Sequence, residues 1–363
     1  MVVSRVSEVI EIQSHRGPYR VWLGSGTPFS ALSNEAGQRR RHFIVDARVN
    51  HLYSNELAPF LAGSSPLLIE AKEEEKSLER MPAFVEQLLG NGVRKGDVLL
   101  AIGGGIIQDI TCFLAAVLLR GLEWQFVPTT LLAQADSCIG SKSSINVGSF
   151  KNVVGTFTPP DVVWINPRVL RTLDPVDLRS GIGEMLKVHA VAGPSSFDEI
   201  AKQYGQLASD EAVLLAFIER SLRLKQRLIE IDEFDEGPRR VMNYGHSFGH
   251  AIESATSFAI PHGIAISIGM DMANFVAARL GFAEASHFIH MHPTLAANYR
   301  GFEDTAIPLD RLLSAMARDK KNEGSKLVLV LPDRQGKVGL VPISRDDRFD
   351  ETCREFLGSV RHS

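Results

Sequence analysis

The sequence has few features that would tie it to a membrane, to nucleic acid or to an oxidising compartment. Its three cysteines, Cys112, Cys138 and Cys353, are odd in number and far apart, which favours a reduced, cytoplasmic protein without a disulfide framework. The formal net charge of −4 gives no general attraction to nucleic acid or to an anionic membrane. No window approaches about eighteen consecutive apolar residues, so we expect no membrane span.

The amino-terminal stretch lacks the pattern of a secretory signal. MVVSRVSEVIEIQ alternates apolar and polar residues, which is typical of a strand and not of the uninterrupted apolar region of a signal peptide. We find neither an internal repeat nor a low-complexity tail. The 363 residues, 44% of them hydrophobic, exceed the usual size of one core, so we expect two domains.

Residues 1–168 alternate short apolar runs with helical patterns. Between the runs lie segments such as 77–89, whose apolar residues recur three and four apart, as an amphipathic helix requires. This alternation predicts an α/β domain with a doubly wound, Rossmann-like, mostly parallel sheet, whose ligand sites lie at the carboxyl ends of strands. The predicted strands are residues 19–23, 42–46, 66–70, 97–102, 123–127 and 161–165.

Helical patterns take over in residues 169–363, which we expect to form a second, mainly α-helical domain. Pro159, Pro160 and Pro167 mark the crossing between the two domains. The predicted helices span residues 177–191, 196–207, 210–231, 245–255, 263–280 and 308–318, and a small hairpin is expected at 327–330 and 337–341.

The clearest strand end in the first domain is DVLLAIGGGIIQDITC. The predicted strand runs into Gly103, Gly104 and Gly105 and then into an apolar helix. Because no side chain stands at this turn, a pyrophosphate can approach the backbone N–H groups and the positive end of the helix. The alternative is a tight turn with no ligand. Asp109, one turn into the helix, can cap, pair with a basic residue or ligate, and the sequence does not choose among these.

A long polar segment follows the strand that ends before Thr129 and Thr130, whose hydroxyls lie at its carboxyl end. The segment QADSCIGSKSSINVGSFKNVV has weak periodicity and includes Asp136, Lys142, Asn146, Lys151 and Asn152. A loop of this length inside a compact domain is more often functional than idle. The alternative is a solvated loop whose lysines face water.

Three histidines stand in the apolar, small-residue stretch NYGHSFGHAIESATSFAIPHG of the second domain. His246 and His250 are four apart, so a helix places both on one face, and His262 follows sixteen residues after His246, beyond Pro261. Two imidazoles brought together by a turn form most of a divalent-metal site if a third ligand arrives from elsewhere. The alternative is that they are core or capping histidines.

The segment GIGEMLKVHA offers that third ligand. Glu184 and Lys187 are three apart on one helical face, a spacing that usually indicates a surface ion pair. The neighbours of Glu184 are apolar or small, however, and an unpaired carboxylate would be costly there. We therefore predict that Glu184 completes the metal site.

Together these motifs resemble those of 3-dehydroquinate synthase and its relatives, the sugar phosphate cyclases. The resemblance covers nearly the whole chain through GGGIIQD, PTTLLAQADSCIGSKSSIN, FKNVVGTF, SGIGEMLK, NYGHSFGHAIE, PHG and RDKKN, in the family's order. It implies the dehydroquinate synthase fold and a phosphate-eliminating lyase of the shikimate pathway that uses NAD and a divalent metal. The implied reaction converts 3-deoxy-arabino-heptulosonate 7-phosphate to 3-dehydroquinate and phosphate by oxidation, elimination, re-reduction and aldol cyclisation.

The resemblance also implies roles for individual residues. The metal, zinc or else cobalt, is expected on Glu184, His246 and His262. The expected NAD-binding residues are Asp46, Glu73, Lys76, Gly103, Gly104, Gly105, Asp109, Thr129, Thr130, Lys142 and Asn152. The expected catalytic residues are Asp136, Lys142, Lys187, Arg239, Asn243 and His250, of which the last contacts substrate or relays a proton. The expected substrate-binding residues are Lys151, Asn152, Lys225, Lys320 and Arg120, which matches an arginine that reaches the partner's substrate phosphate and so implies a homodimer.

Three departures from the family pattern leave the identity of the sugar phosphate open. Ile264 stands where HGEAVA has a glutamate, the loop reads GSKSSIN instead of GGKTGIN, and Gln108 replaces a glycine. The missing carboxylate is expected to remove a hydrogen bond beside a metal ligand. The alternatives are a cyclase that forms 2-deoxy-scyllo-inosose, a valiolone or aminodehydroquinate, a metal-dependent polyol dehydrogenase that releases NADH, and a non-catalytic nucleotide-binding protein.

Overall fold

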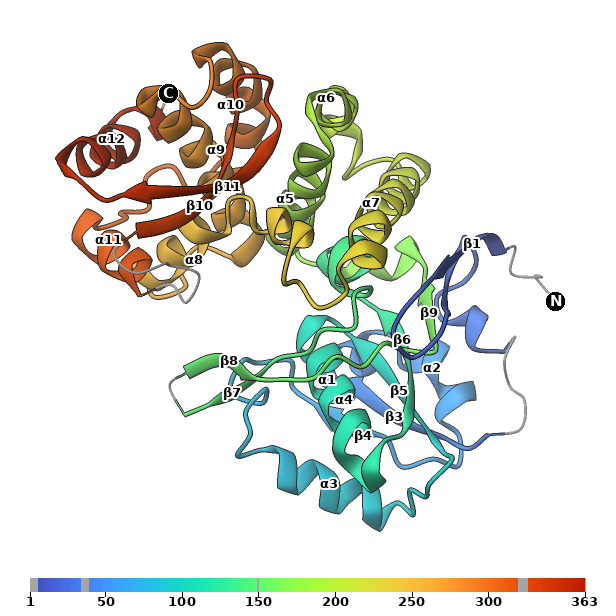
Figure 1. Ribbon diagram of the computed structural model, residues 1–363. Coiled ribbons are helices and arrows are strands. Elements are labelled where there is room, and N and C mark those ends of the chain that lie inside the picture. Colours follow the sequence, from blue (N-terminus) through green and yellow to red (C-terminus); the bar gives the residue numbers. More distant parts are fainter. Residues whose placement is uncertain (1–5, 34–38, 149, 319–325, 363) are drawn as a thin grey trace. The chain divides into compact units, whose positions relative to one another are not determined.

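The predicted strands of the first half form one seven-stranded sheet in the order β1-β2-β9-β6-β5-β3-β4 (Figure 1). Every neighbouring pair is parallel except β1 and β2, which are antiparallel. The mostly parallel sheet is therefore confirmed. Its strands are β1 (Val6–Ile12), β2 (Tyr19–Gly24), β3 (Arg41–Asp46), β4 (Leu67–Ile69), β5 (Val98–Gly103), β6 (Glu123–Pro128) and β9 (Val162–Ile165).

The structure is a computed structural model that describes residues 6–33, 39–148, 150–318 and 326–362. The chain divides into two units, one made of Met1–Leu173 and Ile218–Phe234, the other of Asp174–Phe217 and Asp235–Ser363. With the expected domains, 1–168 and 169–363, the chain would pass from the first to the second only once. In the structure the chain also returns to the first unit within the long helix α7 (Glu211–Ile231).

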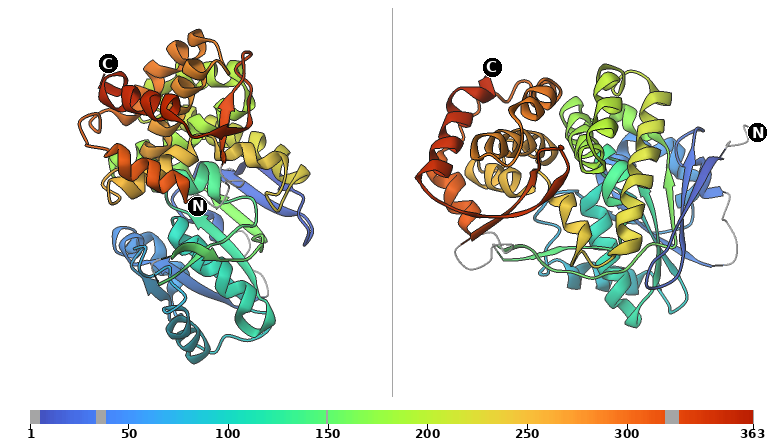
Figure 2. Two further views of the ribbon diagram at one scale, coloured as in Figure 1. Left: turned by 60° about the vertical axis from the view of Figure 1, so that its left-hand side comes forward. Right: turned by 45° about the horizontal axis from the view of Figure 1, so that its top comes forward.

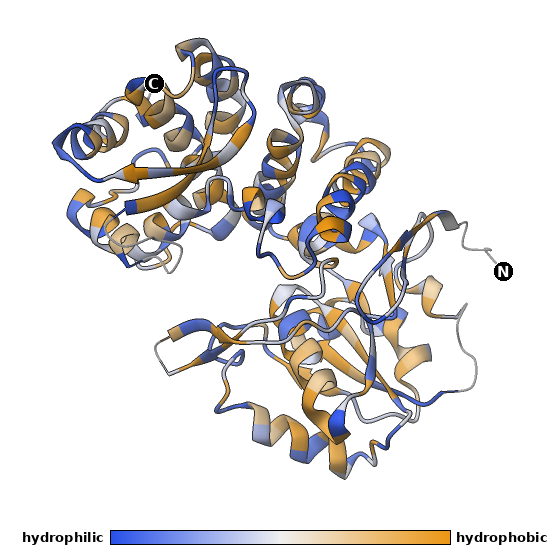
Figure 3. Ribbon diagram, viewed as in Figure 1, coloured by the Kyte–Doolittle hydropathy of each residue, from blue (hydrophilic) through white to orange (hydrophobic). Residues whose placement is uncertain are grey.

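The central strand β5 is apolar along its length and the neighbouring β3 is apolar in its middle, at Phe43, Ile44 and Val45, as Figure 3 shows. All six residues of β5 are buried, which is expected for a parallel strand that is covered on both faces. The helix α4 (Gly105–Val117) follows β5 directly and is buried along most of its length. The other helices of this unit are α1 (Ala47–Leu52), α2 (Ser54–Leu61) and α3 (Met81–Gly90), the last of which begins four residues later than predicted.

The polar segment after β6 has more regular structure than its sequence suggested. It begins with a π-helical turn, η3 (Ala133–Ser137), and continues into a hairpin of β7 (Ile145–Val147) and β8 (Phe150–Val154). Figure 2 shows this hairpin reaching out from the rest of the first unit, in line with the exposure of most β8 residues. A π-turn inserts an extra residue into a helix and is frequent at functional sites.

The second unit is mainly helical, as predicted. Its helices are α5 (Pro175–Ala192), α6 (Pro194–Lys202), the first part of α7, α8 (His246–Ala255), α9 (His262–Leu280), α10 (Ala285–Tyr299), α11 (Leu309–Ala317) and α12 (Asp347–Gly358). The expected hairpin is present as β10 (Lys326–Pro332) and β11 (Val338–Ser344). The sequence patterns had not predicted α10 or α12. Short 3-10 turns in the chain are η1 (Ser30–Ser33), η2 (Leu118–Arg120), η4 (Pro167–Thr172), η5 (Tyr204–Gln206), η6 (Pro238–Asn243) and η7 (Val360–His362).

The helix α9 is the core of the second unit. It packs against α5, α8, α10 and α12. Within the described part of the chain it is the one helix long and apolar enough to cross a membrane, but 83% of its apolar window is buried inside the unit. Such burial is typical of the central helix of a folded unit.

Candidate active site

Glycine contacts bring α5, α8 and α9 unusually close together. A Cβ atom on Gly183 of α5 would lie 2.1 Å from the carbonyl oxygen of Gly263 on α9, and one on Gly263 would lie 1.8 Å from the carbonyl oxygen of Ser180. A Cβ atom on Gly269 of α9 would lie 2.2 Å from the carbonyl oxygen of Gly245, just before α8. No larger residue fits these positions, so the helix backbones touch and the residues beside the glycines are drawn together.

These contacts place Glu184 beside two of the predicted histidines. The Oε1 atom of Glu184 lies 3.1 Å from Nε2 of His262 and 3.7 Å from Nε2 of His246. The donor atoms of His246, His250 and His262 all lie within 4.8 Å of one another. A carboxylate and imidazole nitrogens at this spacing are the donor set that zinc and similar divalent ions prefer. The residues therefore fit the predicted metal.

The ring of His262 is oriented by a second carboxylate that the sequence analysis missed. Its Nδ1 lies 3.2 Å from Oε2 of Glu253, while its Nε2 faces Glu184. Burial alone would lower the pKa of His262, but the hydrogen bonds to the two carboxylates raise it to about 10. Ile264, where a lost hydrogen bond was expected, is fully buried in the core, and Glu253 supplies a carboxylate to the histidine instead.

Several predicted catalytic residues of the second unit surround this cluster or lie in the turn before it. Lys187 is buried, with its Nζ 2.6 Å from Oε2 of Glu184, so the predicted pair exists in the interior and not on the surface. His250 is exposed, and its ring centroid lies 5.2 Å from that of His246. Arg239 is buried in η6, and Asn243 at the end of that turn donates to the Arg240 carbonyl at 3.0 Å. The predicted substrate residue Lys320 lies outside the described residues.

The predicted NAD-binding residues of the first unit follow four neighbouring parallel strands at one edge of the sheet. Asp46 ends β3 and accepts a hydrogen bond of 2.8 Å from the backbone N–H of Arg48, so it caps α1. Burial raises the pKa of the Asp46 carboxyl. Thr129 follows β6 and donates its backbone N–H to the Gly103 carbonyl at 2.9 Å, while the Thr130 hydroxyl accepts from Ala133. The expected site at the carboxyl ends of the strands is therefore assembled from adjacent elements.

The three glycines after β5 differ in what their missing side chains allow. A Cβ atom on Gly103 would lie 2.5 Å from Cγ1 of Ile107, and one on Gly104 would lie 2.8 Å from Cγ2 of Thr130, so the chain's own packing requires both. Apart from its chain neighbours and the backbone of its own helix, no heavy atom of the described residues lies within 4 Å of a Cβ atom on Gly105, the first residue of α4. Packing within the described residues therefore does not require the third glycine, and its predicted contact with a pyrophosphate stays a prediction.

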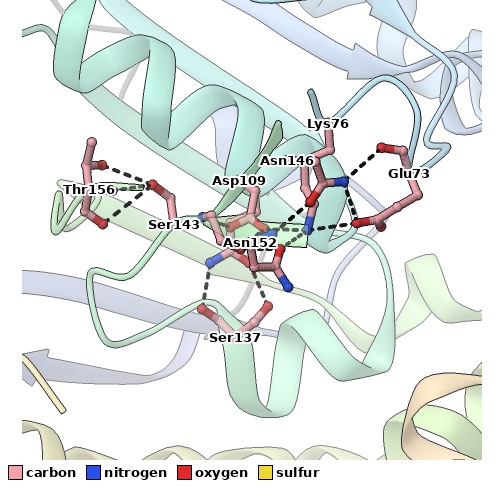
Figure 4. A network of polar contacts seen from close by, with 10 residues as sticks. Glu73, Lys76, Asp109, Ser137, Ser143, Asn146, Asn152 and Thr156 are labelled. Atoms are coloured by element: carbon pink, nitrogen blue, oxygen red, sulfur yellow. Dashed lines mark hydrogen bonds and ion pairs between the residues drawn. The ribbon is translucent and has the colours of Figure 1, made fainter. Parts of the chain in front are cut away.

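A network of polar contacts connects α4, the segment after β4 and the β7–β8 hairpin (Figure 4). The Nζ of Lys76 lies 3.2 Å from Oδ2 of Asp109, 2.9 Å from Oδ1 of Asn152 and 3.4 Å from Oε1 of Glu73. Asp109 also accepts hydrogen bonds of 3.1 Å from the backbone N–H and the hydroxyl of Ser144. Burial raises the pKa of Asp109 despite the ion pair with Lys76. Of the open roles for Asp109, the structure shows pairing with a basic residue.

The remaining predicted catalytic and substrate-binding residues of the first unit are Asp136 in the π-turn, Lys142 and Lys151 after it, and Lys225 on α7. Asp136 is buried, and the Nζ of Lys225 on α7 lies 2.5 Å from its Oδ1 and 2.6 Å from its carbonyl oxygen. Lys142 and Lys151 have exposed side chains. The structure therefore brings Asp136 and Lys225 together.

Arg120 lies at a strained turn after α4. Leu119 and Arg120 have φ values of 51° and 65°, in the left-handed region, and Gly121 follows with 113°. The Arg120 side chain is exposed. Such backbone strain is frequent where a side chain is presented for a function.

Sequence reasoning also missed a reciprocal hydrogen-bonded pair beside Asp136. The amide Nε2 of Gln108 donates to the Ser137 carbonyl at 2.6 Å, and the Ser137 hydroxyl donates to Oε1 of Gln108 at 2.6 Å. Ser137 is one of the residues labelled in Figure 4. The sequence held one sign of this pair, because Gln108 stands where the family pattern has a glycine. Glu253 also had a signal, because it follows His246 by seven residues, two turns along one helical face.

Comparison with known proteins places this chain in a family. Residues 66–180 match the 3-dehydroquinate synthase N-terminal family, and residues 181–322 match the 3-dehydroquinate synthase C-terminal family. The 3-dehydroquinate synthase of Alkaliphilus metalliredigens is 31% identical over 94% of this chain and 97% of its own length. That of Acetivibrio thermocellus is 35% identical over 84% and 86%. The chain belongs to the 3-dehydroquinate synthase family. It is therefore an enzyme, and its class is the lyases.

Solved structures of sugar phosphate cyclases share the fold of this family member. The 2-epi-5-epi-valiolone synthase of Streptomyces hygroscopicus, solved with NAD+ and Zn2+ bound, is 26% identical and has a TM-score of 0.83 over 94% of this chain and 97% of its own. A 2-deoxy-scyllo-inosose synthase, solved with carbaglucose-6-phosphate, NAD+ and Co2+, is 23% identical and has a TM-score of 0.85 over 96% and 100%. The predicted dehydroquinate synthase-like fold is confirmed.

Proposed function

We propose that this family member is a 3-dehydroquinate synthase, which converts 3-deoxy-arabino-heptulosonate 7-phosphate to 3-dehydroquinate and phosphate. The observation that carries the reaction class is the group formed by the buried Glu184 and Lys187 with the half-buried His246 and His262, because a carboxylate, two imidazoles and a cation suit a polyhydroxylated, anionic substrate on a metal. The choice of substrate is supported by the relatives at 31–35% identity, which carry this name.

Glu184, His246 and His262 are the residues that would bind the metal, for which we propose zinc, with cobalt as an alternative. When bound, such an ion lowers the pKa of a substrate hydroxyl, which is what the oxidation step needs. Glu253 keeps the ring of His262 turned so that its Nε2 faces Glu184. The two solved cyclases, which hold Zn2+ and Co2+, support this assignment.

The residues at the carboxyl edge of the sheet would bind NAD. The backbone from Gly103 to Gly105 leaves the amino end of α4 open to a pyrophosphate, and Asp46 and Glu73 follow the neighbouring strands β3 and β4. When bound, NAD takes a hydride from the substrate and later returns it, so that no net oxidation results.

Cationic side chains are proposed to bind the anionic groups of the substrate. Arg239 and Lys187 lie in the second unit, and Lys142, Lys151 and Lys225 lie in the first. A guanidinium binds a phosphate or a carboxylate with paired hydrogen bonds, whereas a lysine acts as a compact charge. We also propose a homodimer in which Arg120 of one subunit serves the substrate phosphate of the other.

The residues that can move protons are His250 and the pair Asp136–Lys225. His250 is exposed, and its ring lies beside that of His246, with centroids 5.2 Å apart. Asn152 and Asn243 are proposed to donate hydrogen bonds that orient the substrate hydroxyls. These groups would serve the elimination of phosphate and the final ring closure, for which correct orientation supplies much of the acceleration.

A second candidate function is another sugar phosphate cyclase, which forms 2-deoxy-scyllo-inosose, a valiolone or aminodehydroquinate. The observations that favour it are the solved cyclases of similar fold and the apolar Ile264 beside the metal ligand His262. A polyol dehydrogenase is the third candidate. A polyol substrate carries no phosphate, so such an enzyme does not need the lysine and arginine side chains that are proposed to bind one.

Product analysis with a panel of sugar phosphates tests the proposal. The purified enzyme is incubated with NAD, zinc and either 3-deoxy-arabino-heptulosonate 7-phosphate, sedoheptulose 7-phosphate or glucose 6-phosphate, with and without a chelator. We expect 3-dehydroquinate from the first substrate and no product in the chelated samples. Turnover of sedoheptulose or glucose phosphate, with none of the carboxylated substrate, would assign the enzyme to the second candidate function.

A further inference from the structure

Ser141 adopts a backbone conformation that a residue with a side chain rarely takes. Its φ is 64°, in the left-handed region, and it follows Gly140, whose φ is 108°. The residue is buried, and it directly precedes Lys142, so its backbone angles set the direction in which the chain leads into that lysine. A strained residue of this kind persists only where the surrounding structure fixes it.

Ser141 and the preceding Gly140 are hydrogen-bonded to three different parts of the first unit. Its hydroxyl donates a hydrogen bond of 2.5 Å to Oε1 of Glu233, and its carbonyl accepts one of 2.7 Å from the backbone N–H of Thr158. The preceding N–H, that of Gly140, donates to the hydroxyl of Tyr19 at 3.1 Å. Of these partners, Glu233 is the one that binds the Ser141 side chain.

Glu233 is itself oriented by the turn between β1 and β2. Its Oε2 accepts a hydrogen bond of 2.7 Å from the backbone N–H of His15, and its Oε1 lies 3.0 Å from the ring nitrogen Nδ1 of His15. Burial alone would raise the pKa of the Glu233 carboxyl, but the hydrogen bonds from Ser141 and His15 lower it. The carboxylate is therefore a charged acceptor in a defined orientation.

The residues around Glu233 contact the same polar segment at two further points. Phe234 packs edge-on against Phe157, with ring centroids 5.0 Å apart. Two turns earlier on α7, Lys225 binds Asp136. The second half of α7 and the residues after it thus contact the segment on both sides of Lys142, which accounts for their place in the first unit.

We propose that Glu233 is a positioning residue that holds Ser141 in its left-handed conformation and thereby orients Lys142 for the substrate. This inference rests on the proposed role of Lys142 in the cyclase reaction. The hydrogen bond and the backbone conformation can be tested without that role, because they also contribute to the stability of the first unit.

The chain offers a matched control three residues before Glu233. Glu230 lies on α7, and its Oε1 accepts a hydrogen bond of 3.2 Å from the backbone N–H of Gln13, near the same turn between β1 and β2. It also binds the side chain of Gln226, and no bond joins it to Ser141. Glu230→Ala therefore removes a comparable carboxylate and leaves the Ser141 contact intact.

The experiment is a double-mutant cycle in the full-length chain. The midpoint temperature of unfolding, KM and kcat are measured for Glu233→Ala, Ser141→Gly, the double variant and Glu230→Ala. We expect Glu233→Ala to lower the midpoint by about 2–4 °C and to lower kcat/KM by about a factor of ten or more. Ser141→Gly, which adopts the left-handed conformation without a side-chain partner, is expected to remain close to the wild type.

The double variant tests whether Glu233 acts through Ser141. If Glu233 acts through Ser141, removing its carboxylate from the Ser141→Gly protein changes both the midpoint and kcat/KM much less than it does in the wild type. Equal losses in the two backgrounds, or losses of the same size in Glu230→Ala, would overturn the proposal. A wild-type enzyme that does not turn over 3-deoxy-arabino-heptulosonate 7-phosphate would count against the proposed function, and the midpoints would still test the Ser141–Glu233 interaction.

Discussion

The variant Gly105→Ala distinguishes the two explanations for the glycines after β5, namely a tight turn with no ligand and a binding site for a pyrophosphate. The residue begins α4, and apart from its chain neighbours and its own helix backbone no heavy atom of the described residues lies within 4 Å of the position that a Cβ atom would occupy. Gly105→Ala therefore introduces no clash within the chain. It places a methyl group at the amino end of the helix, where we propose that the NAD pyrophosphate lies against the backbone.

The two properties of this variant are expected to move in opposite directions. Alanine in a helix is more stable than glycine by about 0.5–1 kcal/mol, which corresponds to a rise of about 1–4 °C in the midpoint of unfolding. A methyl group in a closely fitted contact costs about 1–3 kcal/mol. The dissociation constant for NAD should therefore rise by about 5- to 150-fold.

Calorimetric titration with NAD and a thermal unfolding scan of the same protein check this prediction. Gly104→Ala is the matched comparison, because its Cβ atom would lie 2.8 Å from Cγ2 of Thr130 and should lower stability as well as NAD affinity. If Gly105→Ala binds NAD within about twofold of the wild type, where twofold is about 0.4 kcal/mol, the pyrophosphate does not approach this backbone and the account of the glycines is wrong.

Three further variants test the second unit. Glu253→Ala should weaken zinc binding by about 10- to 100-fold, measured by competition with a chromogenic chelator, because His262 loses the carboxylate on its Nδ1. Gly183→Ala should destabilise the protein by about 3 kcal/mol and release zinc more readily in the same assay, since its Cβ atom would lie 2.1 Å from a carbonyl oxygen. His292→Gln should flatten the pH dependence of the free energy of unfolding. The hydrogen bond to Asp271 raises the pKa of His292 above 6.5. The stabilisation from this contact is therefore complete below pH 6.5 and is lost as the pH rises through the raised pKa.

Each of these variants has a control elsewhere in the second unit. Ser254→Ala changes an exposed neighbour of Glu253 and should bind zinc normally, whereas equal weakening by both would indicate a general effect on α8. Gly205→Ala adds a methyl group in open space and should leave stability unchanged. His290→Gln removes an exposed histidine of α10, and if it flattens the pH profile as much as His292→Gln, the buried contact with Asp271 is not the cause.

The strands of the first unit could be predicted because parallel strands covered on both faces appear as continuous apolar runs. β5 and β6 were placed within one residue of their observed ends for this reason. Where the apolar pattern is interrupted, prediction failed. The helix α10 contains Pro293 and three histidines and was missed, and α12 has a strongly charged surface with few apolar positions.

The metal cluster was predictable in its members but not in its geometry. The apolar setting of Glu184 indicated a buried partner, and Glu184 is indeed buried within 3.7 Å of both His246 and His262. The helix crossing that brings them together depends on backbone contacts at Gly183 and Gly263, which are far apart in the sequence. Sequence spacing records positions within one helix, and it carries no information about which two helices touch.

The polar segment between β6 and β9 shows the same limit in another form. Its π-turn, its hairpin and the left-handed backbone of Ser141 have no sequence period, so the sequence predicted function there without structure. The partners that fix it, Lys225 on α7 and Glu233 just after that helix, come more than eighty residues later in the chain. That helix, α7, also crosses between the two units without any change in its pattern.

In the proposed reaction the enzyme oxidises its substrate only transiently on the way to a carbocycle. The direct measurement follows released phosphate and NADH absorbance together, in one mixture of enzyme, zinc, a small amount of NAD and excess 3-deoxy-arabino-heptulosonate 7-phosphate. We predict phosphate release far beyond the amount of NAD, an equal amount of 3-dehydroquinate and no accumulation of NADH. Accumulation of NADH without phosphate release would contradict the account and indicate a dehydrogenase.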